Sequence, residues 1–170
     1  ALLVAAGLCF VGVNLALLRR QDALHTRVLV GSAVCWLAAH GLFGLGYDAA
    51  AVQGWFAFVI WTIAAERLEM TRLMRRRRAA APALVALLAA MALAVAAAPV
   101  WPVAAGVAYG ATLTGLALWL LAFDIARVTI GSHGLARYMA FCLLVGYLWL
   151  AFAGLAWAGA ALGLPLRDAA

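Results

Sequence analysis

Long apolar runs separated by short polar connections dominate the pattern along this chain of 170 residues. A helix that crosses the hydrocarbon core of a bilayer needs about 20 mostly apolar residues, and six runs have roughly that length. They lie at approximately residues 1–18, 28–47, 51–70, 80–98, 101–124 and 138–163. The pattern predicts an all-α, polytopic integral membrane protein, a helical bundle of six transmembrane helices that forms a single transmembrane domain over residues 1–170.

The composition supports this class. Apolar residues make up 69% of the chain and charged residues 11%, against roughly 45–50% and about 25% in soluble domains. Cys9, Cys35 and Cys142 all lie inside apolar runs and show no CxxC spacing, so they predict neither a disulfide framework nor a zinc site. The composition therefore excludes an ordinary soluble domain.

The arginines set the expected orientation. All 12 basic residues are arginine, and eleven of them lie in or beside the first, third and fifth connections. By the positive-inside rule these connections are cytoplasmic and the N-terminus is outside. The alanine- and arginine-rich composition favours a bacterial protein, and hence a multi-pass protein of the bacterial cytoplasmic (inner) membrane.

A basic block follows the third run, in the segment RLMRRRR. A positive cluster directly after an apolar helix is typical of a segment that binds anionic phospholipid headgroups, and nucleic acid is not expected as a partner. The predicted lipid anchor consists of Arg75, Arg76, Arg77 and Arg78.

Close helix packing is expected where glycines are four residues apart. Gly106 with Gly110, and Gly159 with Gly163, have the GxxxG spacing that lets two helices approach each other in a membrane.

Three acidic residues end apolar runs and are candidates for ion or proton handling, namely Glu66, Glu69 and Asp124. The alternative is a helix end at the membrane interface whose carboxylates neutralise neighbouring arginines. Glu69 can pair with Arg72 at a spacing of three residues, and Arg127 lies one turn beyond Asp124. We favour this second interpretation for all three.

His40 differs because it lies well inside the second run, whereas His25 and His133 fall in the polar connections. An imidazole within the hydrocarbon must form a hydrogen bond or bind a ligand. His40 is therefore either a packing residue bonded to a neighbouring helix or a ligand to haem or copper, with Gly41 and Gly44 leaving room for a macrocycle. A second ligand would have to come from outside these residues, and packing is the favoured interpretation.

Two segments, ERLEMTRL after the third run and FDIARVTIGSHGLARYMAFCLLVGYLWLAFAGLAW across the last two, resemble bacterial polytopic membrane proteins related to the NnrS family. That resemblance implies an association with haem, copper and nitric-oxide stress. It also implies that the chain is part of a longer protein, with further transmembrane helices from the same chain or from a partner subunit.

No catalytic motif is present, since GSHGLAR lacks the Gly-x-Ser-x-Gly pattern of a nucleophile elbow. Three functions remain open. The chain is an NnrS-like haem, copper or nitrosative-stress protein, a non-catalytic transmembrane subunit of a respiratory or other energy-transducing complex, or part of a transporter. A transporter should show a broken span or a polar midplane site.

Overall fold

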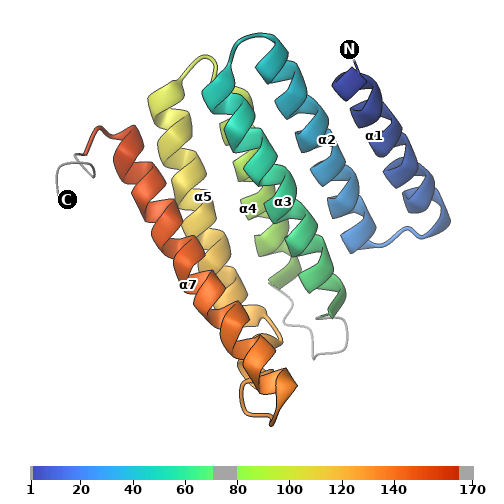
Figure 1. The fold of residues 1–170 in the computed structure, drawn as a ribbon, viewed down its shortest axis with the longest axis vertical. Coiled ribbons are helices and arrows are strands. Elements are labelled where there is room, and N and C mark those ends of the chain that lie inside the picture. Colours follow the sequence, from blue (N-terminus) through green and yellow to red (C-terminus); the bar gives the residue numbers. More distant parts are fainter. Residues whose placement is uncertain (1, 71–79, 165–170) are drawn as a thin grey trace. The chain divides into compact units, whose positions relative to one another are not determined.

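The computed structural model describes residues 2–70 and 80–164, and all regular structure in these two segments is helical (Figure 1). Six helices in the described residues are long and apolar enough to cross a membrane, which agrees with the predicted number of apolar helices. The helices are α1 (Leu2–Arg20), α2 (Leu24–Gly44), α3 (Asp48–Met70), α4 (Ala80–Ala97), α5 (Pro102–Phe123), α6 (Ala126–Thr129) and α7 (Leu135–Ala161).

The chain divides into two compact units, one over Ala1–Met70 and the other over Thr71–Ala170. In the first unit α2 packs against both α1 and α3, and the three helices run alternately up and down (Figure 1). This arrangement places the α1–α2 connection at the same end of the unit as the last turn of α3. The arginines of this unit, Arg19, Arg20, Arg27 and Arg67, therefore belong to one end.

Small residues face large ones in the first unit. A Cβ atom added at Gly31 of α2 would overlap the ring of Trp61 on α3, and one at Gly7 of α1 would lie 2.7 Å from Leu37 Cδ1. The glycines thus allow an indole and a leucine to lie against a neighbouring helix backbone, where they gain dispersion contacts.

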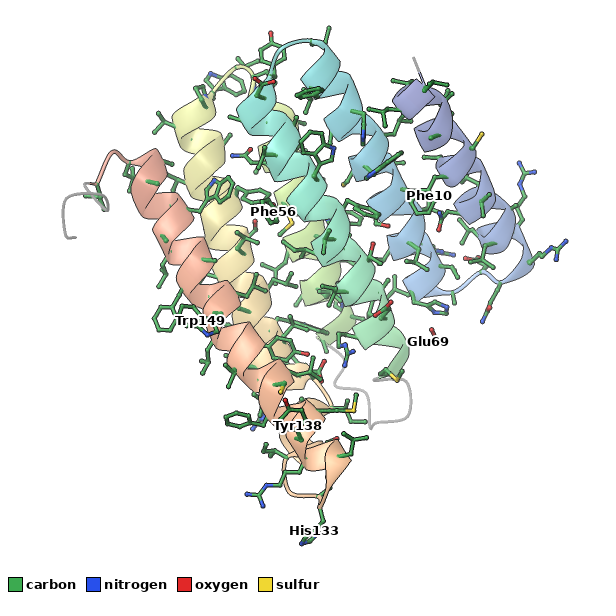
Figure 2. All side chains as sticks on the ribbon, in the orientation of Figure 1. Phe10, Phe56, Glu69, His133, Tyr138 and Trp149 are labelled. Carbon is green, nitrogen blue, oxygen red and sulfur yellow. The ribbon has the colours of Figure 1, made fainter. Side chains whose placement is uncertain are left out.

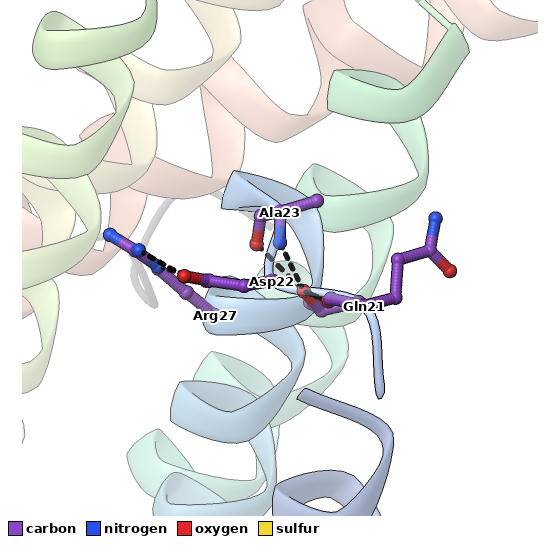
Figure 3. Close-up of polar contacts among 5 residues, drawn as sticks. Gln21, Asp22, Ala23 and Arg27 are labelled. Atoms are coloured by element: carbon purple, nitrogen blue, oxygen red, sulfur yellow. Dashed lines mark hydrogen bonds and ion pairs between the residues drawn. The ribbon is translucent and has the colours of Figure 1, made fainter. Parts of the chain in front are cut away.

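The α1–α2 connection is held by local hydrogen bonds (Figure 3). Thr26 Oγ1 accepts from the Ala23 amide at 3.1 Å and is directed at the carbonyl oxygens of Ala23 and Gln21. Arg27 donates to both carboxylate oxygens of Asp22, at 2.8 Å each. The hydrogen bonds from Arg27 hold the pKa of the Asp22 carboxyl below its ordinary value.

In the second unit α5 packs against α4 and α7. A Cβ atom at Gly110 would lie 2.5 Å from Gly154 O, and one at Gly106 would lie 2.7 Å from Ala161 Cβ. The predicted close approach at Gly106 and Gly110 is therefore confirmed, with α7 as the partner helix.

The second GxxxG prediction is wrong at Gly163. This residue follows the end of α7 with a φ of 72°, and a Cβ atom there would meet nothing within 4 Å. A positive φ is costly for any residue with a side chain, so the glycine is required here by the helix end rather than by helix packing.

Candidate functional sites

His40 lies near one end of α2, four residues before its last residue, Gly44. At 1.5 Å per residue this places it roughly 6 Å from the helix end. The helix ends at Gly44, earlier than the apolar run to residue 47 predicts, so His40 lies within the helix but nearer to its end than predicted. The imidazole is half-buried.

Two polar groups lie close to Nδ1 of His40 and bear on its tautomer. Nδ1 lies 2.8 Å from the carbonyl oxygen of Trp36 and 3.4 Å from Nε1 of Trp55. The carbonyl can only accept and the indole can only donate, so one neutral Nδ1 cannot satisfy both. The shorter distance favours a proton on Nδ1 that is donated to Trp36, which leaves the lone pair on Nε2.

His40 belongs to a network of aromatic rings from all three helices of the first unit, in which Trp36 and Trp55 contact the imidazole directly. We call these rings the His40 cluster, and it comprises Phe10, Trp36, Phe43, Trp55 and Phe58. The Trp36 ring centroid lies 4.2 Å from that of His40, and the Trp55 centroid lies 5.6 Å away. Phe10 on α1 (Figure 2) contacts both Trp36 and Phe58.

The sequence interpretation missed this cluster, although one signal was available. Trp36 and His40 are four residues apart, a spacing that places two side chains on the same face of a helix. The contribution of α3 could not be read in this way, because it depends on how the helices pair.

The other two histidines lie away from His40 in sequence. His25 is in the first turn of α2 and is 7% exposed, so its prediction as a connection residue is wrong. His133 is exposed in the connection between α6 and α7 (Figure 2). Within residues 2–70 and 80–164, no three His, Cys, Asp or Glu side chains form a group that could hold a metal ion.

Asp124 is buried where α5 ends and is only 2% exposed. Its Oδ1 accepts from the Ala126 amide at 2.8 Å, and its Oδ2 accepts from the Tyr147 hydroxyl at 2.9 Å. The carboxyl group thus joins the end of α5 to the first turn of α6 and to the middle of α7. The first backbone amides of a helix have no acceptor within that helix, and Asp124 supplies one for the Ala126 amide.

Arg127 does not neutralise Asp124. Its guanidinium donates instead to the carbonyl oxygen of Ala122, at 2.9 Å, and the ion pair formed among the described residues joins Asp22 and Arg27. The interpretation of Asp124 as an acid that balances an arginine is therefore wrong, because the local hydrogen bonds of a helix junction satisfy both groups separately.

Glu66 and Glu69 are both exposed on the last two turns of α3, and Figure 2 marks Glu69 there. Asp124 belongs to the other unit. The predicted partner of Glu69, Arg72, lies outside the described residues, as does the predicted lipid anchor, Arg75, Arg76, Arg77 and Arg78.

A family model described as "Domain of unknown function (DUF8744)" matches residues 1–170. No curated protein and no solved structure matches the chain.

Proposed function

We propose that this chain, which belongs to the DUF8744 family, is a multi-pass protein of the bacterial cytoplasmic membrane with its N-terminus outside. Six helices of sufficient length and apolar character support membrane insertion. The arginine distribution supports the orientation, since the connections rich in arginine are expected to stay in the cytoplasm. In the first unit the arginines all belong to one end.

Within that membrane protein, we propose that His40 is an imidazole ligand to haem or copper, as in an NnrS-like protein. The observation that carries this proposal is the hydrogen bond between Nδ1 and the Trp36 carbonyl oxygen. Metal-bound histidines commonly donate one ring N–H to a backbone carbonyl, which fixes the ring and presents the other nitrogen to the metal. The His40 cluster adds flat apolar surfaces beside the imidazole.

A second ligand must come from beyond the residues around His40. A further transmembrane helix, from the same chain or from a partner subunit, would supply it. Such a helix would have to approach the half-buried edge of the His40 cluster, close to the end of α2.

Replacing His40 with alanine tests this role. If Nε2 binds haem or copper, the purified His40→Ala protein should lose the absorbance of the bound group while its circular dichroism stays helical. Loss of the ligand removes a coordination bond but little apolar surface. The matched control is His133→Ala, which removes an exposed histidine and should leave the absorbance unchanged.

A non-catalytic transmembrane subunit is the second candidate, and it makes the opposite prediction. Here His40 would adopt the other tautomer, with an unprotonated Nδ1 that accepts from the Trp55 indole nitrogen at 3.4 Å, and would only join α2 to α3. Trp55→Phe and His40→Ala should then each lower stability by about 0.6 kcal/mol, the average for interhelical hydrogen bonds in membranes. A preparation of the parent protein free of haem and copper would favour this candidate and contradict the ligand role.

A further inference from the structure

The end of α1 combines exposed apolar and exposed cationic side chains within two turns. Leu15 and Leu17 are each 43% exposed, and Arg19 and Arg20, at the end of the same helix, are exposed as well. A change from exposed leucine to exposed arginine along one helix is expected where the hydrocarbon meets the headgroups, because arginine stems lie along apolar surface while the guanidinium reaches polar groups.

Arg27, the third arginine of this connection, is already paired with a carboxylate. Arg27 contacts Asp22 through two parallel hydrogen bonds, each 2.8 Å long. This fork geometry is the one that a guanidinium also uses to bind a phosphate. Because Asp22 occupies it, the net positive charge of the connection rests on Arg19 and Arg20, whose guanidinium groups form no ion pair among the described residues.

The connection is also preorganised. The Thr26 hydroxyl and the Ala23 amide close the first turn of α2 (Figure 3), and the Gln21 amide continues the hydrogen bonding of α1 by donating to the Leu17 carbonyl at 2.9 Å. The backbone that carries Arg19 and Arg20 is thus helical to its end. Ordering it costs no further entropy when a ligand binds.

We propose that Arg19 and Arg20 bind the phosphate of an anionic phospholipid such as phosphatidylglycerol, and that the Asp22–Arg27 ion pair takes no part. The exposed leucines one turn earlier would contact the acyl chains of the same lipid. This site is separate from the predicted lipid anchor after α3, and it does not depend on the proposed role of His40.

The test measures binding of short-chain phosphatidylglycerol to the full chain purified in a neutral detergent. Each arginine near an anionic lipid contributes about 1 kcal/mol, so Arg19→Gln with Arg20→Gln should weaken binding about thirtyfold. Both side chains are exposed, so the fold should persist, and circular dichroism checks that it does.

Two control variants separate this site from a diffuse charge effect. Arg127→Gln with Arg137→Gln removes the same charge from exposed residues of the second unit and should leave binding unchanged. Asp22→Asn with Arg27→Gln removes the ion pair at constant net charge and should also leave it unchanged.

Equal weakening by both pairs of arginine substitutions would overturn the proposal, as would binding that no variant changes. Inorganic phosphate and short-chain phosphatidylcholine complete the experiment. Phosphatidylcholine should bind weakly, and inorganic phosphate should not displace the lipid. Displacement by phosphate at equal concentration would show that the site takes a free anion instead.

Discussion

Replacing Gly154 with valine is expected to disrupt the packing of α5 against α7 and to lower the free energy of unfolding by about 3 kcal/mol. A Cβ atom at this position would lie 2.5 Å from Thr114 Oγ1, 2.6 Å from Gly110 O and 2.7 Å from Thr114 N. Two of these three atoms belong to the backbone of α5, so no side-chain rotation can relieve the overlap. The helices must move apart and lose their contacts, which thermal unfolding of the purified protein would detect.

Gly146→Val is the matched control on the same helix. A Cβ atom at Gly146 meets nothing within 4 Å, so the same substitution adds volume without an overlap. Equal melting temperatures for the Gly154→Val and Gly146→Val proteins would contradict the packing of α5 against α7 described above.

Replacing Asp124 with alanine is expected to destabilise the protein by about 2–4 kcal/mol, since a buried acceptor that serves two donors is lost. The Ala126 amide loses its 2.8 Å hydrogen bond, and the Tyr147 hydroxyl loses this acceptor. Asp124 is only 2% exposed, so water replaces these two hydrogen bonds poorly. Denaturant or thermal unfolding of the variant measures the loss.

Two further variants separate this structural role from proton handling. Asp124→Asn keeps one acceptor oxygen and should recover part of the stability, whereas proton transfer through Asp124 would still be abolished. Glu66→Ala removes an exposed carboxylate and should change stability by less than about 0.5 kcal/mol. If Asp124→Ala were as mild as Glu66→Ala, the hydrogen bonds at the end of α5 would not stabilise the fold.

The helices could be predicted from the sequence because each apolar run is long enough to be a span, but their ends could not. Hydropathy locates only the apolar residues. The first turn of α2, which begins at Leu24, contains polar residues, and the helix ends at Gly44, so the apolar run misplaces both ends. The short helix α6 (Ala126–Thr129) lies inside a connection predicted as polar loop. Its start depends on Asp124 accepting from a backbone amide, which no periodicity reveals.

Helix packing was predictable only in part. The spacing of Gly106 and Gly110 correctly indicates a close approach, but the same spacing fails at Gly163, since spacing alone cannot distinguish a helix interface from a helix end. The fit of Trp61 against Gly31 joins residues of two different helices. Such a pair depends on the rotation of each helix about its axis, which an isolated sequence does not specify.

The candidate sites were likewise predictable only in part. His40 was found because a histidine in an apolar run is conspicuous, and Trp36 could have been found from its spacing of four residues. The positions of Trp55 and Phe10 in the His40 cluster required the pairing of α2 with α3 and α1. For Asp124, the sequence suggested a pair with Arg127, but the actual partner, Tyr147, is 23 residues away.

Cysteine accessibility tests the proposed membrane orientation most directly. Cys9, Cys35 and Cys142 would first be replaced by alanine, and single cysteines would then be introduced at exposed positions of the connections. A membrane-impermeant maleimide applied to spheroplasts should label Leu45→Cys and Val100→Cys, both at positions more than half exposed. It should label Gln21→Cys and His133→Cys only after the cells are lysed, because these two connections carry arginines and are predicted to be cytoplasmic. Labelling of Leu45→Cys and His133→Cys from the same side of the intact membrane would contradict the orientation.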